Sequence, residues 1–72
     1  DYDKNNTLSE DNFLYVIGNS INIRKGPGDD YPVIEKAAKN QKLIFLSQKD
    51  DWYKVEVDKT GTEGYVYSKL VQ

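Results

Sequence analysis

Short runs of apolar residues alternate with polar turns along this chain, a pattern that predicts β-strands. Residues 13–18 (FLYVIG) are apolar, rich in β-branched and aromatic side chains, and end at the turn pair Gly18-Asn19. Residues 21–25 (INIRK) switch between apolar and polar positions, which is typical of a half-buried strand. Residues 25–32 hold both prolines and two of the five glycines, so they form a structured loop that interrupts strand pairing.

The second half of the chain continues this rhythm. A short strand follows from Val33, with a turn expected over residues 37–41 (AAKNQ), and residues 42–48 (KLIFLSQ) predict another strand. Residues 52–58 (WYKVEVD) alternate cleanly. A strand here would therefore have two different faces. One face carries Trp52, Lys54 and Glu56, and the other carries Tyr53, Val55 and Val57. Residues 64–68 (GYVYS) predict the last strand, and a single 3₁₀ turn is expected from Ser68.

About five short strands and no apolar stripe of helical period predict a small all-β barrel or sandwich. A barrel suits so short a chain, because closing the sheet removes exposed edges. Residues 1–12 carry almost no core-forming side chains and are interpreted as a flexible acidic linker or tail. The domain itself spans residues 13–72. The predicted core is Val16, Ile21, Ile23, Val33, Ile34, Leu43, Phe45, Val55, Val57, Val66 and Leu70.

The composition narrows the chemistry that the chain can perform. Its 72 residues hold 10 basic and 12 acidic side chains, for a net charge of −2, and neither His nor Cys. Disulfides, the usual zinc sites and Ser-His-Asp or Cys-His pairs are therefore excluded. We expect no enzyme activity, no metal, no cofactor, no nucleic-acid partner and no membrane span. The chain starts without Met or a secretory leader and is interpreted as a mature fragment or excised domain.

Three segments in order resemble the bacterial SH3-like (SH3b) domains: INIRKGPGDDYPVI, WYKVEV and GYVYSKLV. The resemblance spans residues 14–71 and implies a five-stranded SH3-like barrel. It also implies a non-catalytic binding or targeting module of a larger cell-envelope or secreted protein, which recognises peptidoglycan peptides or an extended peptide. Two alternatives stay open: a structural spacer that packs on an adjacent domain of the same protein, and a protein–protein interaction module. A monomer is expected.

Four residues form the predicted ligand site. In an SH3-like barrel the regions that carry Tyr31, Trp52 and Tyr67 converge on one side, where exposed rings bind extended ligands by flat apolar contact. The alternative is that these rings only cover the open end of the barrel. Arg24 is a candidate for holding a peptide carboxylate, or else for an ion pair to Asp29 or Asp30 that pins the loop.

Other features of the sequence are given structural roles. Gly26 and Gly28 are expected to permit positive φ in the loop around Pro27, and Gly64 is expected where a side chain would collide with a neighbouring backbone. Tyr53 and Tyr65 are expected in the core or at its rim. The acidic pairs Asp29-Asp30 and Asp50-Asp51 lie on turns and are expected to be solvated. Residues 1–12 resemble an EF-hand calcium loop, but its Gly and terminal Glu are replaced, so no metal is predicted.

Overall fold

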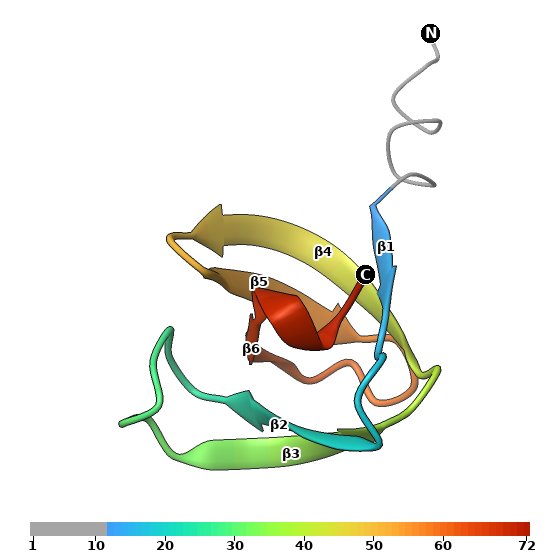
Figure 1. The fold of residues 1–72 in the computed structure, drawn as a ribbon, viewed down its shortest axis with the longest axis horizontal. Coiled ribbons are helices and arrows are strands. Elements are labelled where there is room, and N and C mark those ends of the chain that lie inside the picture. Colours follow the sequence, from blue (N-terminus) through green and yellow to red (C-terminus); the bar gives the residue numbers. More distant parts are fainter. Residues whose placement is uncertain (1–11) are drawn as a thin grey trace, which may run out of the picture.

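The computed structural model describes residues 12–72, which form one antiparallel sheet curled into a small barrel (Figure 1). The predicted tail over residues 1–12, with its likeness to a calcium loop, lies outside the described residues except for Asn12. The elements are β1 (Phe13–Tyr15), β2 (Ser20–Arg24), β3 (Val33–Ala38), β4 (Lys42–Lys49), β5 (Trp52–Val57), β6 (Glu63–Tyr67) and the 3₁₀ turn η1 (Ser68–Leu70).

The strands pair in the order β1-β4-β5-β6-β2-β3. Strands β4, β5 and β6 follow one another as a meander, and β2 and β3 form a hairpin that joins them where Arg24 pairs with Tyr65. Figure 1 shows β2 and β3 below β4 and β5, with β6 between the two layers. The predicted all-β, SH3-like barrel is confirmed, and the six strands include β1 with only three residues.

The described residues contain no α-helix, and the expected 3₁₀ turn begins at Ser68. None of their helical segments has the length and apolarity needed to cross a bilayer. An isolated bridge between Val16 and Val71 joins the segment after β1 to the C-terminal end of the chain. Consequently the last residues of the chain lie beside β1, as Figure 1 shows.

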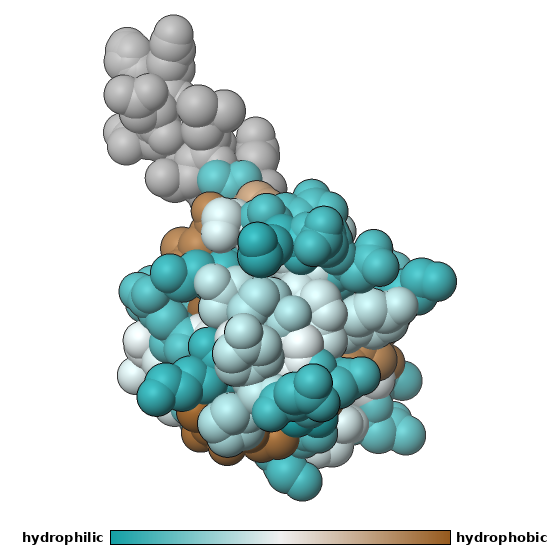
Figure 2. All heavy atoms as spheres, turned by 90° about the vertical axis from the view of Figure 1, so that its left-hand side faces the viewer, coloured by the Kyte–Doolittle hydropathy of each residue, from teal (hydrophilic) through white to brown (hydrophobic). Residues whose placement is uncertain are grey.

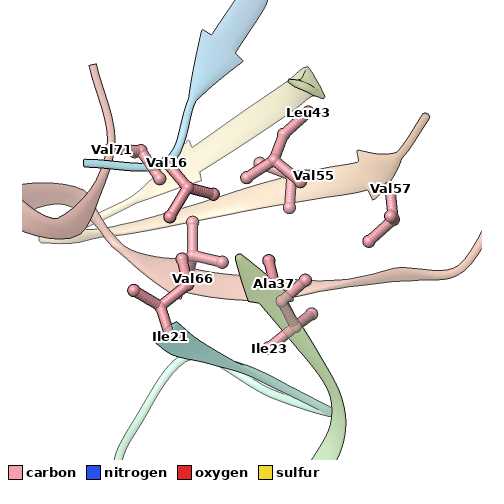
Figure 3. Packing of buried hydrophobic residues seen from close by; sticks show 9 residues of the cluster. All are labelled: Val16, Ile21, Ile23, Ala37, Leu43, Val55, Val57, Val66 and Val71. Atoms are coloured by element: carbon pink, nitrogen blue, oxygen red, sulfur yellow. The ribbon is translucent and has the colours of Figure 1, made fainter. Parts of the chain in front are cut away.

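The core fills the space between the two layers of the barrel (Figure 3). Side chains that face inward from β2, β4, β5 and β6 meet there, and no polar or charged residue among those described is buried with them. The alternation predicted for β2 and β5 is therefore confirmed. The buried residues are Val16, Ile21, Ile23, Ala37, Leu43, Val55, Val57, Val66 and Val71.

The prediction of which β3 residues face the core was wrong. Val33 and Ile34 were expected in the core but are 40% and 43% exposed, and the buried residue of this strand is Ala37. Facing residues of an antiparallel pair lie on the same side of the sheet, and Ile21 faces Ala37. The register then shifts beyond Ile23, so Val33 faces outward.

Two further core predictions need correction. Leu70 is half-buried and packs against the core from outside, and Phe45 is half-buried with its ring against that of Tyr53. Val71 takes a place that the sequence did not predict, because the bridge to Val16 turns its side chain inward. The turn predicted over residues 37–41 begins later than expected, because β3 continues to Ala38 and the turn lies at Lys39 and Asn40.

Gly64 lies where β6 passes closest to β2, as expected. A Cβ atom at this position would lie 2.5 Å from Cγ2 of Ile23 and 2.9 Å from the carbonyl oxygen of Arg24. The second of these atoms belongs to the backbone and cannot move aside like the end of a flexible side chain. Gly64 thus allows β2 and β6 to approach each other and the barrel to close.

Candidate functional site

The outer face of the barrel carries a pair of aromatic rings from neighbouring strands. Val55 and Val57 point into the core, so the alternation of β5 turns Trp52 outward. Trp52 faces Tyr67 of β6, and their ring centroids lie 5.6 Å apart with planes tilted by 59°. Both rings are half-buried, which leaves part of each apolar surface available for contact.

A cleft of about 440 Å³ opens beside these two rings. Its walls come from the end of β6 and η1, from β2, from the loop between β2 and β3, and from the start of β5. The lining residues are Gly18, Ser20, Ile21, Asn22, Arg24, Asp29, Trp52, Tyr67 and Leu70. A volume of this size lies within the range of ligand-binding pockets in proteins, about 300–1,000 Å³.

Figure 2 shows the face on which the loop after β2 and the turn after β4 project. The centre of this face is pale, so residues of intermediate hydropathy gather there, and hydrophilic side chains surround them. The acidic pairs Asp29-Asp30 and Asp50-Asp51 lie on these two projecting segments and are exposed, as predicted. Because solvent surrounds these carboxylates, they are poorly suited to acid–base catalysis.

Hydrogen bonds from Arg24 hold the loop over residues 25–32. Its Nη1 donates to the carbonyl oxygens of Asp29 and Tyr31, at 3.1 Å and 2.8 Å. The backbone closes the loop as well, since the amide of Lys25 donates to the carbonyl of Pro32 at 2.9 Å. The expectation that Arg24 pins this loop is confirmed, but the predicted ion pair to Asp29 or Asp30 is wrong, since backbone carbonyls take its place.

The ring of Tyr31 lies on Gly26, inside this loop. A Cβ atom on Gly26 would lie 2.3 Å from the ring, so only glycine leaves room for it. The φ angles of Gly26 and Gly28 are not positive, contrary to the sequence-based expectation. Space for the Tyr31 ring is therefore the reason for glycine at position 26.

Three of the four predicted ligand-binding residues meet in the cleft, and the fourth does not. Arg24, Trp52 and Tyr67 line it. Tyr31 is 46% exposed and lies on its own loop beside the cleft. Contact between Tyr31 and a ligand stays a prediction, while its packing on Gly26 is a role that the sequence did not indicate.

Several residues that line the cleft were not predicted, although the sequence carries a signal for some of them. Ser20 and Asn22 share the outer face of β2 with Arg24, and the alternation of this strand could have placed all three together. Leu70 was assigned to the core, and only the 3₁₀ turn explains why it also reaches the cleft.

The remaining tyrosines of β5 and β6 do not line this cleft. Tyr53 packs against the core, as predicted, and its ring meets Phe45 edge-on at 5.3 Å. Tyr65 pairs with Lys54, is half-buried and lies on the outer face of β6, so it is not a core residue. A second hollow of about 240 Å³ lies beside Tyr53 and is lined by Asn12, Phe13, Leu14, Phe45, Gln48 and Tyr53.

Comparison with known proteins identifies relatives of this chain. The model of the family described as Bacterial SH3 domain matches residues 19–72. A protein of Synechocystis sp. named Serine/threonine-protein kinase D is 40% identical over 60 residues, which cover 76% of this chain. The chain spans 12% of the length of that kinase.

Proposed function

The chain belongs to the bacterial SH3 domain family, and on this basis we propose that the cleft beside Trp52 and Tyr67 binds peptidoglycan peptides in an extended form. Bacterial SH3 domains are in general non-catalytic protein- or peptide-binding modules. The proposal places the parent protein in the cell envelope or outside the cell, where such peptides occur.

The aromatic pair in the cleft is the observation that carries this proposal. Trp52 and Tyr67 present flat, half-buried rings beside the polar side chains of Ser20, Asn22 and Arg24. Apolar faces next to a few hydrogen-bonding groups suit a peptide, whose backbone needs polar partners and whose side chains need apolar contact. The cleft holds no pair of facing carboxylates and neither His nor Cys, which supports binding rather than catalysis.

Sedimentation with purified peptidoglycan tests this function. The 72-residue chain is mixed with peptidoglycan sacculi, and the bound fraction is measured with the wild type and with Trp52→Ala. We expect retention of the wild type and about tenfold weaker retention of the variant, because a central aromatic contact contributes on the order of 2 kcal/mol. Equal retention of both proteins, or none of either, contradicts the proposal.

The melting temperature of Trp52→Ala provides the necessary control. Trp52 lies outside the buried core, so its removal should lower stability by less than about 2 kcal/mol, mainly through lost contact with Tyr67. If the variant is unfolded at room temperature, Trp52 is a structural residue and the site loses its central contact.

A second candidate function is supported by the apolar surface of β3. Tyr31, Val33 and Ile34 are each at least 40% exposed and follow closely in sequence. The related kinase contains the matching region as 12% of its length, which suits a module covered by a neighbouring domain. If the chain acts as such a spacer, it will not sediment with sacculi, and these residues will be protected from solvent only in the longer protein.

A further inference from the structure

Two hydrogen bonds hold the Arg24 side chain in place, and its other donors find no acceptor among the described residues. A guanidinium has five N–H donors, two of them on Nη1. Both Nη1 donors are used by the carbonyl oxygens of Asp29 and Tyr31. The donors on Nε and Nη2 have no acceptor among the described residues, and together they form one edge of the planar group.

The positive charge of Arg24 also has no partner among the described residues. Asp29, five positions along the chain, offers its backbone carbonyl to Arg24, and the structure gives no ion pair between the two side chains. The salt bridge found within residues 12–72 joins Lys54 Nζ to Glu63 Oε1 at 3.9 Å instead. Arg24 therefore brings to the lining of the cleft a cation that two hydrogen bonds fix and that forms no ion pair with another described residue.

The surroundings of Arg24 suit an anion of a particular shape. One edge of a guanidinium matches the two oxygens of a carboxylate in parallel hydrogen bonds. Ser20 and Asn22 line the cleft from the same strand and can donate further hydrogen bonds. Asp29 also lines the cleft, but it is exposed, so solvent screens its charge.

We propose that the peptide bound in this cleft carries a carboxylate that docks on the free edge of the Arg24 guanidinium. This inference rests on the proposed function, since it names the group by which the cleft orients its ligand. The carboxylate can come from the end of the peptide or from an acidic residue within it. In both cases the two hydrogen bonds donated by Nη1 already fix the orientation of the guanidinium, so little side-chain entropy is lost on binding.

A set of four peptides tests the proposal on the unmodified protein. The probe is the tetrapeptide L-Ala–γ-D-Glu–L-Lys–D-Ala, as the free acid, amidated at its terminus, amidated at the α-carboxylate of its D-Glu, or amidated at both. The fluorescence of Trp52, the single tryptophan of the chain, reports binding from inside the cleft. One amidation should weaken binding about tenfold, which identifies the source of the carboxylate.

Two variants assign this difference to Arg24. Arg24→Gln should bind the free acid and the amides alike, because the charged edge is gone. Lys25→Gln removes the neighbouring exposed cation outside the cleft and should keep the tenfold preference. Melting temperatures of both variants show whether the loop change has unfolded the domain, and the comparison of peptides on the wild type does not depend on them.

The outcomes separate this inference from the proposed function. If all four peptides bind the wild type equally well, the carboxylate contact is wrong and the peptide-binding cleft stands. If Arg24→Gln is folded and keeps the tenfold preference, another group receives the carboxylate and the inference fails. If none of the peptides changes the fluorescence of Trp52, the binding of peptidoglycan peptides fails, and the inference fails with it.

Discussion

Gly64 and Gly26 each lie against a neighbouring group that leaves no room for a Cβ atom. At Gly64 the obstacle is the backbone of β2 and a buried side chain, whereas at Gly26 it is the exposed ring of Tyr31. A rigid neighbour cannot yield to an added side chain, but an exposed ring can rotate away. The two glycines should therefore respond differently to substitution.

The first prediction concerns Gly64. Gly64→Val should lower the free energy of unfolding by more than about 1 kcal/mol, because its Cβ would lie 2.9 Å from the Arg24 carbonyl and 2.5 Å from Ile23. Urea denaturation measures this loss. Gly61→Val is unsuitable as a control because Gly61 has a φ of +79°. Asp58→Val introduces the same branched side chain at an exposed position of the turn after β5 and should change stability little; an equal loss there would contradict the steric explanation.

A double-mutant cycle tests the contact between Gly26 and Tyr31. Gly26→Ala should destabilise the domain by about 1 kcal/mol, because the new methyl group displaces the Tyr31 ring from its place. In a Tyr31→Ala background the same change should cost much less, since the obstacle is gone. Thermal melts of the four proteins give the coupling, and a cost that is the same in both backgrounds would show that Tyr31 is not the obstacle.

Single residues of the site could be predicted to different extents. Trp52 was placed outside because Val55 and Val57 must face inward, and Arg24 was recognised as a residue that holds its loop. The carbonyl partners of Arg24 could not be foreseen, because they depend on how residues 25–32 fold back. Tyr31 was placed in this loop, but the packing of its ring on Gly26 could not be foreseen for the same reason.

Among the elements, the pattern of apolar and polar residues predicts which side chains of β5 face the core, but not which side chains of β3 do. Strand β5 has neighbours on both sides and one face that is buried at Val55 and Val57, so its alternation specifies its orientation. Strand β3 lies at the edge of the sheet, and its register to β2 shifts between Ile23 and Arg24. Such an irregularity moves apolar side chains to the other face without leaving a mark in the hydrophobic pattern.

A pair of matched substitutions tests this view of β3. Val33→Ala should lower stability by less than about 0.5 kcal/mol, because Val33 is 40% exposed on the edge strand. Val57→Ala removes the same atoms from a fully buried site and should cost about 2 kcal/mol. Chemical denaturation of both variants measures the difference. Similar losses would mean that Val33 lies in the core, as the sequence alone suggested.

At the scale of the whole molecule, closing the barrel brings distant segments to one face. The cleft combines Arg24 and Asp29 with Trp52 and Tyr67, although more than 20 residues separate Asp29 from Trp52 in the chain. The hydroxyl of Thr60, in the loop after β5, joins this loop to β3 by donating to the carboxylate of Glu35 at 2.9 Å. The barrel fold could be predicted from the order of the strands, but the set of residues lining the cleft required the three-dimensional arrangement.

The affinity of the peptidoglycan tetrapeptide for two tyrosine variants tests the central claim most directly. Tyr67 and Tyr65 are half-buried residues of β6 and lie on the same outer face, but only Tyr67 lines the cleft. Titrations followed by the fluorescence of Trp52 give the dissociation constants of the wild type, Tyr67→Ala and Tyr65→Ala. We predict about tenfold weaker binding for Tyr67→Ala and nearly unchanged binding for Tyr65→Ala. Equal affinities in the two variants would contradict the assignment of this cleft as the peptide-binding site.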